Sequence, residues 1–276
     1  SKNHGGLDNN SQTIVKAAFD NDIVMVSNNY INYRLMYSPL CLNETSQVNI
    51  VSDNGNKYLF NGETFYNPLR KYGLFDGTYT ITSISSSHPI ALLNANKTGL
   101  ITYEIDDSTV ITIKVNGGSF TAPYYVFKDE NDNTIGINNF KFMRNKTYRF
   151  IANGISSSHP YKMFVNGQYT NVISGSSGSI EFKINHDHSV ASGDFYYQCN
   201  VHSSMKNNLS LLNRDITNTT SDGNYDFYYG DITITVNGDF DELSVYCFYH
   251  GYMGGENLFK YSITCQPESE PELEPE

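Results

Sequence analysis

Hydrophobic and polar residues alternate along most of the chain in short runs, a pattern that predicts β-strands with one buried face. Residues 78–84, for example, read Thr-Tyr-Thr-Ile-Thr-Ser-Ile. Runs of about 5–7 residues recur between clusters of Asn, Asp, Gly and Ser, and no helical period competes with them, which indicates an all-β sandwich protein. The predicted strands are 22–27, 48–51, 58–62, 78–84, 90–93, 100–105, 110–118, 124–127, 147–151, 161–165, 180–184, 195–199, 209–212, 225–236 and 244–247.

Two short motifs each occur twice along this pattern. Ile-Ser-Ser-Ser-His-Pro stands at 84–89 and 155–160, and Cys-x2-His-x2-Met stands at 199–205 and 247–253. A thiolate, an imidazole and a thioether on one tight loop are three of the four ligands of a blue-copper site, which has two His and one Cys in a plane and a weak axial Met. Each His-Pro segment offers the missing imidazole. The predicted ligand sets are His88, Cys247, His250 and Met253, and His159, Cys199, His202 and Met205.

The spacing of these ligands predicts a nested domain arrangement. His159 precedes Cys199 by 40 residues, whereas His88 precedes Cys247 by 159. Residues 107–214 form a self-contained unit of 108 residues. Without this unit the separation between His88 and Cys247 would be 159 − 108 = 51 residues, a spacing that suits one module. We therefore expect an outer domain of residues 55–106 plus 215–265, with residues 107–214 inserted into it, since insertion at a surface loop is tolerated.

Two terminal segments complete the expected organisation. Residues 1–54 carry strand signals and are expected to pack on the outer domain as an N-terminal strand segment. Residues 266–276 contain five Glu and three Pro with little to bury, and predict a disordered acidic tail. The chain begins at Ser1 without Met, and we expect a processed or truncated product.

Charge and composition narrow the classes of partner and activity. The 276 residues carry a formal net charge of −11 with only 18 Lys and Arg, which argues against nucleic acid or an anionic membrane as a partner. No run of about 18 apolar residues is present, so no membrane span is expected. No nucleophile elbow, P-loop or paired-carboxylate signature stands out, and we expect a binding or carrier protein rather than an enzyme. The redox partner is not indicated.

The four cysteines bear on the cellular compartment. If Cys199 and Cys247 hold a metal, Cys41 and Cys265 remain near the two ends of the folded part and could form a disulfide in an oxidising compartment. Several Asn-x-Ser/Thr glycosylation sequons are also present. These features favour an extracellular protein or one on the surface of a particle such as a virion.

The repeated ligand pattern resembles a known family. An upstream His with Cys-x2-His-x2-Met on the loop before the last strand resembles the cupredoxins, such as plastocyanin, azurin and amicyanin, and the short loop is most similar to that of amicyanin. The likeness occurs twice and covers about residues 55–265. It implies two cupredoxin-like Greek-key β-sandwiches, the second inserted into the first, with one copper ion per domain. The modules also look like cupredoxin-like proteins of large marine viruses.

The resemblance also implies a role for each ligand and one departure. Cys would carry the electronic coupling, the two His would be equatorial, and Met would be the weak axial ligand that tunes the potential. In many family members the residue after the first His donates its backbone N–H to the thiolate. Here that residue is Pro89 or Pro160, which has no N–H, so a lowered potential is expected.

Three functions remain open from the sequence. The first is single-electron transfer through type 1 copper. The second is a structural or adhesive surface protein that uses the sandwich as a scaffold and needs no metal. The third is a copper carrier or storage protein that exchanges the metal. Zinc could occupy the same Cys and His ligands, although the thioether favours copper.

Overall fold

The computed structural model describes residues 17–19, 22–24, 39–188, 193–216 and 224–265. Within these ranges the regular structure is β-strand, apart from the single 3-10 turn η1 at Ala95–Lys97, so the all-β prediction is confirmed. A short hairpin pairs β1 (Ala17–Phe19) with β2 (Asp22–Val24). The acidic tail 266–276 and most of the N-terminal segment, residues 1–16, 20–21 and 25–38, lie outside the described residues.

The first strand group contains strands from two distant parts of the chain. One four-stranded sheet has the order β10-β24-β8-β4 and another has the order β25-β27-β7-β3, with smaller pairs β26-β9, β5-β6 and β22-β23. Its strands are β3 (Leu40–Cys41), β4 (Thr45–Gln47), β5 (Asn49–Ser52), β6 (Asn56–Leu59), β7 (Tyr72–Leu74), β8 (Gly77–Ile84), β9 (Ile90–Leu92), β10 (Ile101–Ile105), β22 (Asn213–Asp215), β23 (Asn224–Asp226), β24 (Gly230–Val236), β25 (Glu242–Leu243), β26 (Val245–Cys247) and β27 (Phe259–Tyr261).

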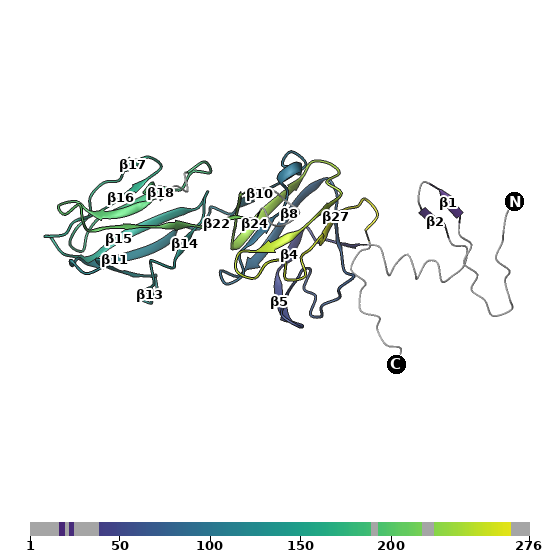
Figure 1. Cartoon of the computed structure of the whole chain (residues 1–276), viewed down its shortest axis with the longest axis horizontal. Coiled ribbons are helices and arrows are strands. Elements are labelled where there is room, and N and C mark those ends of the chain that lie inside the picture. Colours follow the sequence, from purple (N-terminus) through teal and green to yellow (C-terminus); the bar gives the residue numbers. More distant parts are fainter. Residues whose placement is uncertain (1–16, 20–21, 25–38, 189–192, 217–223, 266–276) are drawn as a thin grey trace.

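The second strand group is continuous in sequence between residues 111 and 211. Its main sheets have the orders β13-β12-β11-β15-β18 and β17-β16-β19-β20, and β14 pairs with β21. Its strands are β11 (Ile111–Gly117), β12 (Tyr125–Lys128), β13 (Thr134–Ile135), β14 (Lys141–Phe142), β15 (Thr147–Ile155), β16 (Tyr161–Val165), β17 (Gln168–Tyr169), β18 (Ser179–Lys183), β19 (Tyr196–Cys199), β20 (Lys206–Asn208) and β21 (Ser210–Leu211). Figure 1 shows the two groups side by side along the long axis of the molecule.

The alternation of buried and more exposed side chains explains why these segments form strands. In β8, Tyr79 and Ile81 are buried, while Thr80 and Thr82, which follow them, are only partly buried. The neighbouring strand β24 alternates in the same way, and its Ile234 lies directly opposite Tyr79. Apolar side chains on the same face of paired strands pack together and remove their surface from water, which stabilises the sheet.

Each strand group encloses its own hydrophobic core. The first cluster of buried residues draws on positions 40–105 and 212–259, and the second draws on positions 113–209. Met143 is the exception, because it lies within the second group's sequence but belongs to the first cluster, where its sulfur accepts the backbone N–H of Tyr229 at 3.4 Å. The expected boundary at residue 54 falls within a hairpin, since β5 pairs with β6 across it.

Polar contacts join the two strand groups. The Arg144 guanidinium pairs with the carboxylate of Asp226 from the first group and also donates to the carbonyl of His188. Nearby, the Lys146 ammonium donates to the carbonyl oxygen of Asp106 at 2.7 Å. The Arg144 side chain is only 6% exposed and that of Asp226 16%, so this pair connects the groups in a largely dry setting.

Cys41, on the edge strand β3 of a four-stranded sheet, forms a disulfide with Cys265. Both β3 and β27 pair in parallel with β7, and the bond passes over Gly73 of that strand. A Cβ atom at residue 73 would lie 2.5 Å from the Cβ of Cys265, so only glycine leaves room for the bridge. The disulfide thus ties the start of the first group to its end.

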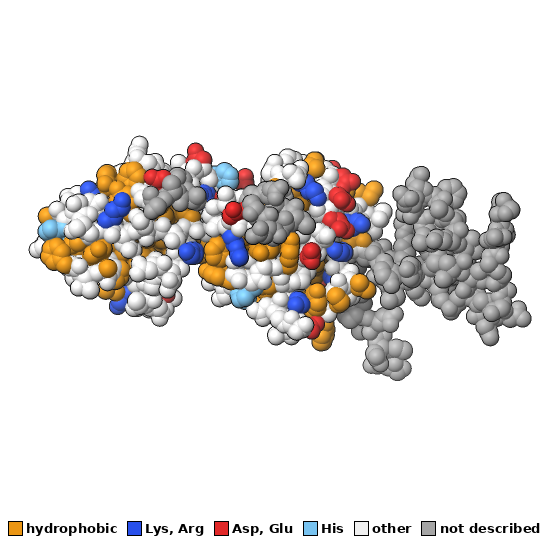
Figure 2. Space-filling model, viewed as in Figure 1, with side chains coloured by type: hydrophobic (Ala, Val, Ile, Leu, Met, Phe, Trp, Pro, Cys, Tyr) orange, Lys and Arg blue, Asp and Glu red, His pale blue; other side chains and the backbone are white. Residues whose placement is uncertain are grey.

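The surface carries charges of both signs. On the face displayed in Figure 2, basic side chains lie among acidic and uncharged ones rather than in one continuous patch. None of the helical segments in the described part of the chain has the length and apolarity that a membrane crossing requires.

Candidate metal centres

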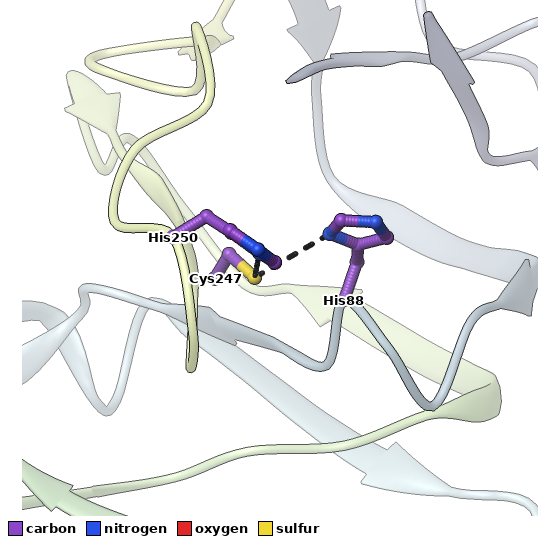
Figure 3. Close-up of side chains that lie close together, drawn as sticks. All are labelled: His88, Cys247 and His250. Atoms are coloured by element: carbon purple, nitrogen blue, oxygen red, sulfur yellow. Dashed lines mark hydrogen bonds between the residues drawn. The ribbon is translucent and has the colours of Figure 1, made fainter. Parts of the chain in front are cut away.

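The first site is formed by His88, Cys247 and His250. His88 lies in the turn between β8 and β9, Cys247 ends β26, and His250 follows on the next loop. Strand β9 pairs antiparallel with β26, with Ile90 opposite Cys247, and this pairing brings His88 to the cysteine across 159 residues of sequence. The Nδ1 atoms of His88 and His250 lie 3.9 Å and 3.5 Å from the Cys247 sulfur (Figure 3).

The second site is formed by His159, Cys199 and His202 in the same register. Strand β16 pairs antiparallel with β19, and Tyr161 lies opposite Cys199. In both sites the residue two positions after the upstream histidine therefore faces the cysteine. The Nδ1 atoms of His159 and His202 are 3.9 Å and 3.6 Å from the Cys199 sulfur and 3.1 Å from each other.

Matching backbone hydrogen bonds hold the two sites. In each His-Pro turn the histidine N–H donates to the carbonyl of the serine three residues earlier, and in each cysteine loop the residue after Cys donates to the proline carbonyl. These bonds are His88 to Ser85 at 2.9 Å, His159 to Ser156 at 3.0 Å, Phe248 to Pro89 at 3.0 Å and Asn200 to Pro160 at 2.7 Å. Because the backbone contacts repeat, the ligand side chains are presented by the same local geometry twice.

The separations of the donor atoms fit a bound cation. In each site the two imidazole nitrogens and the sulfur all lie within 4.8 Å of one another. With metal–nitrogen bonds of about 2.05 Å and a metal–sulfur bond of about 2.3 Å, tetrahedral geometry places two nitrogens about 3.3 Å apart and each nitrogen about 3.6 Å from the sulfur. The nitrogen–sulfur distances of 3.5–3.9 Å in both sites, and the 3.1 Å between the two nitrogens of the second site, lie close to these values, so both groups could hold a metal ion.

The predicted methionines lie on the same loops. Met205 is buried in the second core, and its backbone carbonyl accepts the N–H of Cys199 at 3.0 Å. Met253 is buried in the first core, and its carbonyl accepts the N–H of Tyr58 at 2.9 Å. Their position on the ligand loops agrees with the sequence pattern, and the axial role of either sulfur stays a prediction.

The two sites differ in their exposure to solvent. Both cysteines are fully buried, but His250 of the first site is exposed whereas His159 of the second is only 9% exposed. Phe120, itself 66% exposed, contacts the edges of both second-site histidines, with ring centroids 4.9 Å from His159 and 5.1 Å from His202. The second site is therefore the better covered of the two.

Burial sets the protonation of the groups around the first site. Burial, together with the nearby His250, lowers the pKa of His88 below its ordinary value of 6.5. The imidazole is then neutral near pH 7, as a metal ligand must be. Burial, with a further contribution from the Cys247 side chain, raises the pKa of Tyr58 well above its ordinary value, so its hydroxyl remains protonated.

Sequence reasoning missed three aromatic residues beside the sites. Tyr58, Tyr125 and Phe120 carry no local motif, and Tyr58 and Tyr125 precede the histidines that they contact by 30 and 34 residues. Aligning the two halves of the repeat around their His-Pro turns is the signal that could have drawn attention to a tyrosine upstream of each. Their placement depends on strand packing rather than on spacing along one element.

Comparison with known protein families finds no family model that matches the chain, and a search of curated proteins finds no matching sequence. Function must therefore be argued from the two sites themselves.

Proposed function

We propose that this protein binds copper at the first and second sites and acts in single-electron transfer. Each site combines two histidine Nδ1 atoms and a buried cysteine sulfur, with a buried methionine on the same loop. Among common metal sites, two His, one Cys and a distant Met are the ligand set of blue copper. When bound, copper would supply a one-electron redox couple.

The repeated register and hydrogen bonds of the two sites are the observation that carries the proposal. A chance cluster of His and Cys would not recur in the same strand register. In each site the cysteine lies opposite the residue two positions after the upstream histidine, which is Ile90 in one site and Tyr161 in the other. We further propose that the two strand groups are cupredoxin-like domains, the second inserted into the first. Their separate cores and the two chain crossings near residues 105–111 and 211–213 support this arrangement.

The residues around each site would keep the ligands in one arrangement. Cys247 is fixed by strand pairing and by hydrogen bonds with Gly251, and His88 by its turn. Ligands held in this way change position little between metal oxidation states, which favours rapid electron exchange. Because both cysteines are buried, solvent has little access to their sulfur atoms, which limits oxidation of the thiols.

We also propose that the protein works outside the reducing cytosol, in the extracellular space or on a particle surface. The disulfide between Cys41 and Cys265 supports this location, because such bonds persist in oxidising compartments.

Optical titration of the metal-free protein with Cu(II) tests the copper proposal. We expect an intense visible thiolate-to-copper band that saturates at two equivalents. Cys199→Ser and Cys247→Ser should each remove part of the band, and the double variant should remove all of it. The matched control is the pair Cys41→Ser and Cys265→Ser, which deletes the other two cysteines and should leave the band in place.

Other outcomes separate the rival functions. Absence of the band in the wild type would overturn the electron-transfer proposal and favour a metal-free scaffold. Zn(II) binding without a copper band would indicate structural zinc sites. A band that bleaches rapidly on addition of a Cu(I) chelator, with no reversible redox cycle by voltammetry, would favour a copper carrier.

A further inference from the structure

A guanidinium from a distant part of the chain contacts the ligand loop of the first site. Arg214 donates from Nη1 to the carbonyl oxygen of Phe248, the residue that follows the ligand Cys247. Its guanidinium carbon also lies 5.7 Å from the ring centroid of Tyr246 and 6.0 Å from that of Phe248. One cation therefore contacts the residues on both sides of the ligand cysteine in the sequence.

Both polar groups of the Phe248 backbone are hydrogen-bonded. Its N–H donates to the carbonyl of Pro89 at 3.0 Å, and its carbonyl accepts from Arg214. Two backbone hydrogen bonds between Cys247 and Gly251, at 2.7 Å and 3.2 Å, close the same loop. Phe248 is thus a point at which the loop is attached to other segments of the first strand group.

Arg214 belongs to the segment that returns from the second strand group to the first. It lies in β22, opposite Tyr225 of β23, and Figure 1 shows β22 where the two groups meet. Two residues before Arg214, the N–H of Leu212 donates to the carbonyl of Phe142 in the second group at 2.7 Å. The strand that carries the guanidinium is therefore anchored to both groups.

The second site differs at the corresponding positions. Tyr246 and Phe248, the aromatic neighbours of the first ligand cysteine, are replaced by Gln198 and Asn200 in the second ligand loop. Neither of these side chains offers an aromatic ring to a guanidinium. The second site is instead covered by Phe120, which contacts both of its histidines. Two sites with the same ligand pattern are thus supported differently, one by a ring over the ligands and the other by a cation on the ligand loop.

We propose that Arg214 is a positioning residue of the first metal site, which keeps the loop 247–253 closed around its ligands Cys247 and His250. The hydrogen bond holds the loop at Phe248, and the two ring contacts restrict the side chains beside the cysteine. Because a charge-assisted hydrogen bond is stronger than one between neutral groups, its loss should let the loop open more often. This inference rests on the proposed copper-binding function and adds a residue that determines how firmly the first site holds its metal.

Hydrogen exchange in the metal-free protein tests the effect on the loop. Arg214→Met keeps an apolar side chain and removes the donor and the charge. We expect the amides of Phe248 and Gly251 to exchange about tenfold faster or more, as the loss of one hydrogen bond from a charged group implies. The amides of Asn200 and Met205 in the second ligand loop should exchange at the wild-type rate. Arg214→Lys, which retains a charged donor, should lie between wild type and Arg214→Met.

Release of copper to a chelator tests the consequence for the site. Cys199→Ser leaves a ligand cysteine only in the first site, and Cys247→Ser leaves one only in the second. In the Cys199→Ser background, Arg214→Met should speed the release of Cu(II) about tenfold and shift the thiolate-to-copper band. In the Cys247→Ser background the same substitution should change neither quantity.

A matched control removes another guanidinium from the first strand group. Arg70 pairs with Glu63 at 2.7 Å, and Arg70→Met should leave the exchange of the loop amides and the release of copper unchanged. If Arg70→Met speeds exchange as much as Arg214→Met does, the effect is a general loosening of the group and the proposal is overturned. Unchanged exchange in Arg214→Met, or faster exchange with unchanged copper release, would also overturn it. A wild type that develops no copper band would instead overturn the proposed function, while the exchange rates would still decide whether Arg214 holds the loop.

Discussion

Removal of the disulfide is expected to destabilise the first strand group strongly. The change is the double substitution of Cys41 and Cys265 by serine, which leaves the candidate ligands in place. The bond closes a loop with a sequence separation of 224 residues. In the chain-entropy treatment, a loop of this length stabilises the folded state by about 5.4 kcal/mol, because it restricts the unfolded chain.

The expected magnitude depends little on whether the second group stays folded. If residues 111–211 remain folded while the first group unfolds, the flexible loop shrinks to 224 − 101 = 123 residues. The stabilisation is then about 4.9 kcal/mol, because the entropy of loop closure grows only with the logarithm of length. Measured effects of disulfides are commonly 2–4 kcal/mol, so we expect a loss of about 3–5 kcal/mol.

Urea unfolding and hydrogen exchange measure this loss and locate it. The chain has no Trp and 22 Tyr, so tyrosine fluorescence and circular dichroism report unfolding. Amides of β7 and β27, which lie beside the bridge, should lose protection, whereas amides of β11 and β15 should keep theirs. A loss below about 1 kcal/mol, or an equal loss of protection in both groups, would refute the reasoning.

Three further predictions concern the junction and the second site. Arg144→Met should destabilise the protein by about 3–5 kcal/mol in urea unfolding, since Asp226 is left buried without its partner, and a loss below about 1 kcal/mol would show that the pair is unimportant. Burial raises the pKa of Asp107, but hydrogen bonds from Lys183 and the Thr147 amide lower it more, so the pKa in the folded protein lies below its ordinary value of 3.8. The ionised carboxylate therefore stabilises the folded state above the unfolded pKa, and this stabilisation is lost as pH falls through the folded pKa. The difference in unfolding free energy between wild type and Asp107→Asn should therefore vanish at low pH, and a difference independent of pH would contradict this. Phe120→Ala should speed the reaction of the second-site thiol with a thiol reagent severalfold in the metal-free protein without changing that of the first site, and equal rates before and after the change would show that the ring does not cover the site.

The local alternation of hydrophobic and polar residues predicted most of the features of the fold that the sequence revealed. Strand positions followed from alternation, because a residue's neighbours at i ± 2 share one face of a sheet wherever that sheet lies. Strand β8 and the region of β24 were both anticipated in this way, whereas the short strands β13, β14, β17 and β20 were not, since two or three residues carry no detectable period.

The ligand loops were also readable because their chemistry is local. Cysteine and histidine three residues apart on one tight loop must lie close together, so His250 could be placed beside Cys247 from spacing alone. His88 could be assigned to the same site only because the motif occurs twice and the longer spacing left room for an inserted unit. Strand pairing between β9 and β26 then brought it to the cysteine.

Only the tertiary structure decided which residues surround the ligands. Tyr58 and Tyr125 reach the histidine carbonyls, and Phe120 covers the second site, through contacts between separate strands and loops. Whether Cys41 could reach Cys265 also depended on β7, which pairs both with β3, where Cys41 lies, and with β27, which ends four residues before Cys265. Such contacts arise from the packing of distant segments into a shared core, and packing depends on every neighbour at once, whereas a motif depends on a few adjacent residues.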